Sequence, residues 1–451
     1  MNRFLIITIL LFIVAIKLIS QTTSITIYNN NFGVVNEIRE LEINKGTSTI
    51  KITDVPSSII PTSVSIKLDG TILEQNYQYD LVSLNSLLQK FIDKEIKLVN
   101  NSSKTNELIT GKLLSISGNQ IVVQTPTNLI AFPNINDLTL QLDNLPDGLL
   151  TKPTLVWLVL ANKSGKQKID FSYMTNDIKW EANYVGVLNE DDTEMSFNAW
   201  VSIENNSGGT FKDAKLKLIA GEVENNLRGY ADYIGYAETP LMPMRAKNSA
   251  PEFKEEAFFE YHFYELNNST TIANNEIKQI SLFNIPKIKV KKRLLHSNKW
   301  KNNTNGKIDV YIQFDNSKSN NLGMPLPKGG VQIFKTHNNS NEFIGADAIE
   351  HTATDEKVDL KVGTAFDVLA NEIITNNNYR EKISEASYEI TYKNRKAEPV
   401  EVEVQREVGP NWEILQTSHQ WEKVDASTIK YIIKLKPKEE VILKYKIRNE
   451  Y

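Results

Sequence analysis

The sequence of 451 residues contains no cysteine. This absence excludes disulfide bonds, thiol nucleophiles, cysteine metal ligands and a lipid-bearing cysteine after a signal segment. Exported eukaryotic proteins of this size often carry disulfides. A cysteine-free exported chain therefore favours a bacterial source, and its stability must come from its cores alone.

The sequence has only one long apolar run, and it lies at the N-terminus. A basic start is followed by apolar residues 4–16, Lys17 and a small residue, Ser20. These are the parts of a secretory signal peptide, and the run is shorter than the ~20 apolar residues of a spanning helix. We predict a signal peptide over residues 1–20 and an exported protein, periplasmic or secreted. The alternative is an uncleaved anchor, because Leu18 is not the small residue preferred before a cleavage point.

Local motifs of catalysis and cofactor binding are missing as well. The five histidines lack zinc spacing, and the sequence has no G-x-S-x-G elbow, phosphate loop or dinucleotide fingerprint. The acidic cluster at 190–194 lacks the calcium-loop pattern and is interpreted as a solvated hairpin tip. A net charge of −4 argues against a general nucleic-acid binder. No catalytic residue, metal ligand or cofactor is predicted.

Alternation of apolar and polar residues with period two is abundant. Residues 400–404 place valines on one face and glutamates on the other, as a half-buried strand requires. Turn sequences rich in Asn and Gly, such as residues 206–209, separate these runs. Helical periodicity is clearest at residues 81–92, with Ser83 as the expected N-cap. We therefore predict an all-β fold of several β-sandwich, immunoglobulin-like units with few helices.

The length and the changes in composition predict several domains. Residues 21–80 are expected to form an N-terminal β domain. Residues 81–146 hold the helix and four or five short strands, which suits a small SH3-like barrel; the alternative assigns these strands to a neighbouring sandwich. Residues 150–451 are expected to form a C-terminal array of sandwiches. A mobile loop rich in Gly and Pro, residues 225–257, interrupts that array.

Several blocks of the C-terminal part resemble a bacterial domain of unknown function, family 4139. The similarity is carried by a W-x-A-x-Y strand and by the strand, turn and strand that follow it, at residues 178–184, 200–208 and 211–223. Residues 260–264 resemble a second block. The resemblance is best from residue 155 to 451 and implies a β-rich exported or envelope protein. It supplies no reaction, cofactor or catalytic residue, although some relatives are labelled mucoidy inhibitors.

Aromatic residues provide one set of candidate binding residues. Trp412 follows a turn at the start of a strand, where a partly exposed ring could stack on a sugar face. Three tyrosines spaced by three in the predicted loop could form a recognition segment that orders on binding: Tyr230, Tyr233 and Tyr236. Trp180 and Trp200 belong to the family blocks and are expected in the core.

A basic run provides the second set. Alternation on a strand places three lysines on one face: Lys287, Lys289 and Lys291. They could contact an anionic glycan or lipid head group. Alternatively, they protect an edge strand from pairing with another molecule.

Taken together, these patterns predict a non-catalytic binding or structural module of the cell envelope, with a protein or an envelope glycan as partner. An envelope hydrolase acting on glycan or peptide and a carbohydrate-binding protein are the alternatives. The hydrolase would need His262, His419 and the acidic clusters to converge in one cleft. His262 is otherwise expected to be a half-buried strand residue with a satisfied hydrogen bond.

Overall fold

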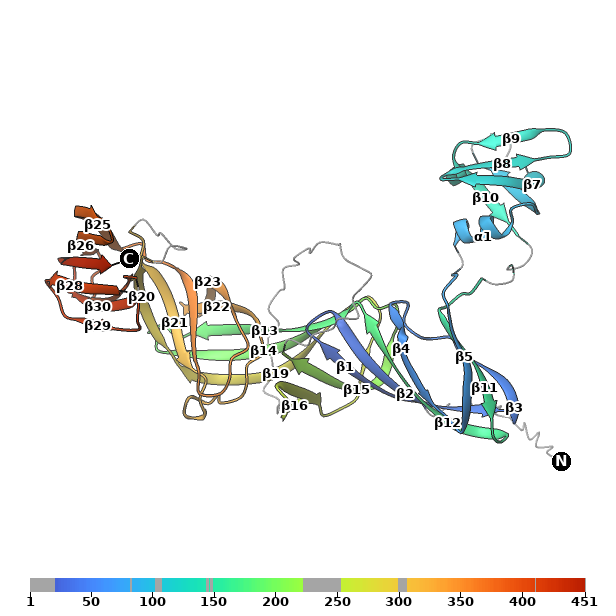
Figure 1. Ribbon diagram of the computed structural model, residues 1–451, viewed down its shortest axis with the longest axis horizontal. Coiled ribbons are helices and arrows are strands. Elements are labelled where there is room, and N and C mark those ends of the chain that lie inside the picture. Colours follow the sequence, from blue (N-terminus) through green and yellow to red (C-terminus); the bar gives the residue numbers. More distant parts are fainter. Residues whose placement is uncertain are drawn as a thin grey trace, which may run out of the picture.

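The computed structural model describes residues 21–81, 83–101, 108–142, 146, 149–221, 253–298, 306–409 and 411–450. Within these ranges strands are the dominant secondary structure and the chain has one α-helix, so the predicted all-β fold is confirmed. The strands form separate sheets arranged in an elongated row, with one small unit standing to the side (Figure 1). Among the described residues, no helix combines the length and the apolar character that crossing a bilayer requires.

The N-terminal strands pair with strands from beyond the small unit. An eight-stranded sheet has the order β16-β17-β15-β1-β2-β12-β4, with β18 paired to β15. The bounds are β1 (Gln21–Tyr28), β2 (Phe32–Ile43), β4 (Ile59–Lys67), β12 (Gly165–Asn176), β15 (Phe211–Ala220), β16 (Phe253–Phe258), β17 (Tyr261–Leu266) and β18 (Thr270–Ile272). Strand β1 runs parallel to β15, and β2 pairs along its whole length with β12. Strands from residues 21–80 therefore share this sheet with strands from beyond residue 150.

A three-stranded sheet packs against part of this large sheet. Its order is β3-β11-β5, with bounds β3 (Gly46–Ile52), β5 (Gly70–Gln78) and β11 (Thr154–Ala161). The buried ring of Trp157 on β11 meets that of Phe171 on β12 edge-on, with 5.4 Å between centroids. These two layers form the N-terminal sandwich.

The small unit has a core of its own. Its helix α1 (Leu84–Lys90) begins at the predicted cap, where Ser83 Oγ accepts a hydrogen bond from the Ser86 N–H at 3.0 Å. The sheet order is β10-β6-β7-β8-β9, with bounds β6 (Glu95–Asn100), β7 (Leu108–Ser117), β8 (Gln120–Gln124), β9 (Leu129–Phe132) and β10 (Leu138–Gln141). In the described part of the unit no pairing joins β9 to β10, so the sheet is open and the SH3-like barrel stays a prediction.

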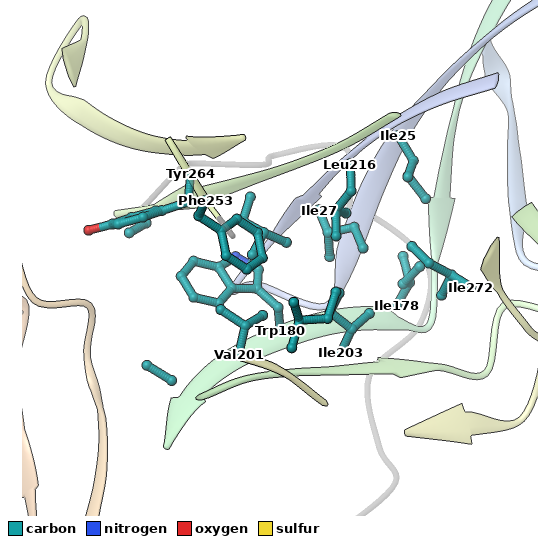
Figure 2. Close-up of a cluster of buried hydrophobic side chains, with 14 of the residues drawn as sticks. Ile25, Ile27, Ile178, Trp180, Val201, Ile203, Leu216, Phe253, Tyr264 and Ile272 are labelled. Carbon is teal, nitrogen blue, oxygen red and sulfur yellow. The ribbon is translucent and has the colours of Figure 1, made fainter. Parts of the chain in front are cut away.

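The blocks at residues 178–184 and 200–208 lie near the centre of the row (Figure 1). A five-stranded sheet has the order β19-β14-β13-β22-β23, with bounds β13 (Ile178–Leu188), β14 (Glu194–Asn205), β19 (Glu276–Lys289), β22 (Gly329–His337) and β23 (Ser340–Ile349). Figure 2 shows its Ile178, Trp180 and Ile203 meeting Ile27 and Leu216 of the large sheet. Trp180 is buried and donates from Nε1 to the Ile219 carbonyl at 3.0 Å.

Trp200 does not join this core. Strand alternation directs Ala199 and Val201 inward and turns Trp200 to the opposite face of β14, where it is half-buried. The prediction that Trp200 is a core residue is therefore wrong, whereas the same prediction for Trp180 is confirmed.

The C-terminal sandwich lies at one end of the row (Figure 1). Its six-stranded sheet has the order β24-β21-β20-β27-β30-β29, and its four-stranded sheet has the order β25-β26-β31-β28. The bounds are β20 (Lys291–Ser297), β21 (Asp309–Asp315), β24 (Lys357–Thr364), β25 (Val368–Arg380), β26 (Ile383–Asn394), β27 (Val400–Glu407), β28 (Asn411–Thr417), β29 (Trp421–Lys423), β30 (Thr428–Leu435) and β31 (Glu440–Glu450). Apolar side chains from both sheets form one enclosed core.

Candidate functional site

The predicted binding residue Trp412 lies at the start of β28, an edge strand of the four-stranded sheet. Its Nε1 donates a hydrogen bond to the Ala426 carbonyl oxygen at 2.8 Å. Trp421 comes from β29, an edge strand of the facing sheet, and meets Trp412 edge-on with 5.4 Å between ring centroids and 67° between planes. The two rings, which we call the tryptophan pair, therefore bridge the two sheets along one side of the sandwich.

The two rings of the tryptophan pair differ in exposure. Trp412 is half-buried, packs on the C-terminal core and has the Lys423 ammonium 5.4 Å from its ring centroid. Trp421 is 36% exposed. Trp412 thus supports the site together with the Lys423 cation over its ring, and Trp421 presents the more open aromatic surface of the pair. A ring with an adjacent positive charge can contact a sugar face and an anionic group together.

The three predicted lysines lie where β19 ends and β20 begins. Lys287, Lys289 and Lys291 are all exposed, and β19 is an edge strand of the five-stranded sheet. Lys287 Nζ lies 2.6 Å from the Glu194 carboxylate at the start of β14. The edge position suits the interpretation in which lysines protect an edge, and binding of an anionic ligand here stays a prediction.

The acidic cluster forms the expected hairpin tip between β13 and β14, but one of its carboxylates is not freely solvated. Asp192 adopts a left-handed backbone conformation with φ of 57° and accepts hydrogen bonds from the ammonium groups of Lys292 and Lys335. Partial burial opposes ionisation of Asp192, yet the two lysines hold the pKa of this carboxyl below its ordinary value. The acidic tip and the basic run therefore neutralise one another in part.

Only residues 253–257 of the predicted loop at 225–257 lie within the described residues. Tyr230, Tyr233 and Tyr236 lie outside the described residues, so their role as a recognition segment stays a prediction. Residues 253–257 belong to β16, an edge strand of the eight-stranded sheet. Strand β16 pairs antiparallel with β17.

The titratable residues required by the hydrolase alternative do not converge. His262 on β17 is half-buried with Nδ1 2.8 Å from the Glu255 carboxylate, which is the satisfied strand histidine expected from sequence. His419 lies after β28 in the C-terminal sandwich, beside the Ser418 hydroxyl at 2.8 Å. Among the described residues, no three His, Asp or Glu side chains are placed to hold a metal ion.

Sequence reasoning missed a buried polar cluster in the C-terminal sandwich. Arg406 of β27 is 1% exposed, binds both oxygens of Glu372 across the core and donates from Nε to the Tyr445 hydroxyl at 2.9 Å. Burial disfavours its charge, but Tyr445 and Glu372 outweigh burial and raise the pKa of the guanidinium. Nearby, His296 Nδ1 lies 2.7 Å from the Tyr392 hydroxyl. Burial, aided by the Arg406 charge, lowers the pKa of His296 from 6.5 to about 4, so its imidazole is neutral at pH 7.

A second buried cluster lies in the N-terminal sandwich. Arg39 Nε donates to Glu37 Oε2 at 2.8 Å, and Arg39 Nη1 donates to Asp54 at 2.5 Å. The Tyr173 hydroxyl donates to the other Glu37 oxygen at 2.7 Å, and the guanidinium lies 5.5 Å from the ring centroid of Phe171. Burial and the Glu37 charge raise the pKa of Tyr173 well above its ordinary value, so its hydroxyl stays a donor. Each ionised group in this cluster has a counter-charge.

No family model matches the chain, and a search of curated proteins finds no match. The site must therefore be interpreted from its own geometry.

The alternating pattern contains a signal for both buried clusters. Val402, Val404 and Arg406 fall on one face of β27, and Val35, Glu37 and Arg39 fall on one face of β2. A charged residue in register with core positions predicts a buried partner. The partners lie on other strands, and the sequence alone does not reveal which.

Proposed function

We propose that this chain is an exported cell-envelope or secreted protein that acts as a non-catalytic binding or structural module. The observation that carries the proposal is the tryptophan pair with Lys423 at the side of the C-terminal sandwich. Its rings come from strands of two different sheets, so the rigid sandwich fixes their relative position. Sites placed on such rigid elements bind with little loss of side-chain freedom.

The partner best suited to this surface is a glycan, and an anionic one in particular. Trp421 offers a partly open aromatic surface, and Lys423 places a positive charge beside the pair. Aromatic rings have a large apolar area and lose little rotamer freedom on binding, and a cation beside them favours carboxylated or phosphorylated sugars. A protein partner is the other possible outcome.

A non-catalytic role is supported by the positions of the charged clusters. The arginines and tyrosines that come together in the two sandwiches are buried and bind the carboxylates beside them. Such groups account for packing and strand register without any reaction. The proposal of an envelope hydrolase has no comparable support.

Export and family membership are further parts of the proposal. The signal-like segment at 1–20 supports export, and the blocks at 178–223 support membership of the bacterial family of unknown function numbered 4139. Cell fractionation of a C-terminally tagged chain, with N-terminal sequencing of the mature product, tests export. We expect the tag outside the cytoplasm and a new N-terminus at Gln21. Recovery from the cytoplasm with Met1 retained would contradict it.

The binding proposal is tested on an array of neutral and anionic envelope glycans, in parallel with pull-downs from envelope extracts. Trp421→Ala should weaken binding by at least about tenfold, in line with the loss of an aromatic contact at a hot spot. Phe259→Ala is the matched control, because this aromatic residue is exposed but lies in the β16–β17 turn. Wild-type binding to a protein but to no glycan would make the partner a protein. Equal losses of binding in both variants would contradict the proposal that the tryptophan pair is the binding site. Failure of the wild type to capture any partner would contradict it as well.

A further inference from the structure

Strand β25 (Val368–Arg380) leaves one long edge of the C-terminal sandwich open. It has 13 residues and is the outer strand of the four-stranded sheet. In the described part of the chain β25 pairs only with β26, and Ala370 N–H also donates to the Gly306 carbonyl at 3.1 Å. From Asn371 onward, the edge of β25 that faces away from β26 pairs with no other strand in the described part of the chain. Figure 1 places β25 at the outer end of the elongated row, away from the small unit.

The composition of β25 distinguishes it from three other edge strands, β19, β16 and β24. Lysines and Pro286 interrupt β19, β16 carries Lys-Glu-Glu, and β24 carries two lysines and an aspartate. Such charges and prolines normally prevent sheets from joining at their edges. Strand β25 has only Glu372 and Arg380, and Glu372 is turned inward to Arg406. Its Ile373 and Ile374 are 52% and 54% exposed.

The residue order of β25 is self-complementary in the antiparallel sense. Glu372 and Arg380 lie equally far on either side of Asn376, and so do Ile373 and Tyr379. When two copies pair around Asn376, each Glu372 faces an Arg380 and each Ile373 faces a Tyr379. Aromatic–aliphatic pairs on facing strands are stabilising, and no like charges face each other in this register. Glu372 already binds Arg406 within its own copy, so the Ile373–Tyr379 pairs carry the contact.

We propose that two copies of this chain associate through antiparallel pairing of their β25 strands around Asn376. The association extends the four-stranded sheet across a twofold axis and satisfies backbone groups that a lone edge leaves to water. The pairing of β25 with β26 shifts by one residue between Ile374 and Asn376. A shift of this kind increases local twist. The paired segment covers residues 372–380, because the edge is already occupied at Ala370 by its hydrogen bond to Gly306.

The absence of cysteine allows a direct test by single-cysteine cross-linking of the full chain. Facing residues of antiparallel strands have Cα atoms about 4.5–5.5 Å apart, within the range that a disulfide spans. Asn376→Cys should therefore give a disulfide-linked dimer under mild oxidation at low protein concentration. Ile277→Cys is the control, because Ile277 is also exposed, at 56%, on the edge strand β19. Equal cross-linking of the two variants would contradict the proposal.

Sedimentation equilibrium gives an independent measurement on the cysteine-free chain. Wild type should dimerise, and Ile373→Lys should raise the dimer dissociation constant by at least about tenfold, because a lysine is the residue that natural edges use against pairing. Ile277→Lys should leave it unchanged. Far-UV circular dichroism of both variants verifies folding. A wild-type chain that stays monomeric at about 100 µM, or equal effects of the two lysines, would overturn the proposal.

Discussion

Replacing Arg39 by methionine is expected to lower the free energy of unfolding of the N-terminal sandwich by about 3–5 kcal/mol. Methionine keeps an apolar stem but removes the guanidinium that binds Glu37 and Asp54. Glu37 is 2% exposed, and its carboxylate would keep only hydrogen bonds from neutral side chains, Tyr173 and Gln21. The cost is large because the buried Glu37 charge has lost its hydration, and the two remaining neutral donors do not replace the counter-charge.

The losses of unfolding free energy caused by other variants of this cluster should follow a fixed order. Asp54→Asn should cost about 1 kcal/mol or less, because the Asp54 side chain is 50% exposed and such pairs contribute little. Tyr173→Phe should cost about 1.5–3 kcal/mol, the range for a buried hydrogen bond to a charged group. The double variant Glu37→Gln/Arg39→Met should lose less than Arg39→Met alone, because the unpaired charge is gone.

Urea unfolding followed by hydrogen exchange of peptides from β2 and β12 measures this series. Local exchange is required because a chain with several cores does not unfold as one two-state unit. The reasoning is refuted if Arg39→Met lies within about 1 kcal/mol of Asp54→Asn. It is also refuted if adding Glu37→Gln to Arg39→Met recovers no stability, since the buried charge would then not be the cause.

Two further predictions concern the C-terminal sandwich and a turn. The pKa of His296 in the folded state is about 4, below its ordinary value of 6.5. Between these two values the unfolded state binds more protons than the folded state. The free energy of unfolding should therefore fall by up to about 3 kcal/mol as the pH drops from 6.5 to 4. His296→Gln should lose this part of the pH dependence in thermal unfolding between pH 4 and 7, whereas His337→Gln should retain it. Gly208 has φ of 82° and a Cβ there would collide with Ser57, so Gly208→Ala should cost about 2–4 kcal/mol in urea unfolding. Gly118→Ala, with φ of 57° and open space, should cost only about 1 kcal/mol, and equal costs would contradict the steric reasoning.

Strand faces could be predicted because alternation depends only on the geometry of the chain itself. Val402 and Val404 are buried as the pattern of residues 400–404 requires, and Glu401 is exposed. The same reasoning extended by two residues places Arg406 inside. The same reasoning does not predict that Glu372 is the partner of Arg406. Glu372 lies on the opposite sheet, and nothing in the sequence links its strand to that of Arg406.

Strand partners could not be predicted, and this limit explains the differences at the candidate site. β1 pairs with β15 across nearly 200 residues, and many amphipathic strands of similar length would have fitted equally well. The acidic cluster and the basic run are separate features in the sequence, yet Asp192 and Lys292, which are 100 residues apart, form a hydrogen bond of 2.7 Å. Only the packed sheets bring the hairpin tip to the start of β20.

The two proposed contacts occupy opposite edges of one sheet, in the order β25-β26-β31-β28. A second copy at β25 therefore leaves Trp412 on β28 uncovered, and a ligand there does not block the shared edge. A dimer would carry two tryptophan pairs, one on each outer side of the joined sheets. On a repetitive glycan surface, two linked sites can raise the overall affinity by about 10²–10⁴ without any new contact. Loss of dimerisation should then weaken attachment to a multivalent surface and leave the affinity for a single short glycan unchanged, which separates failure at β25 from failure at the tryptophan pair.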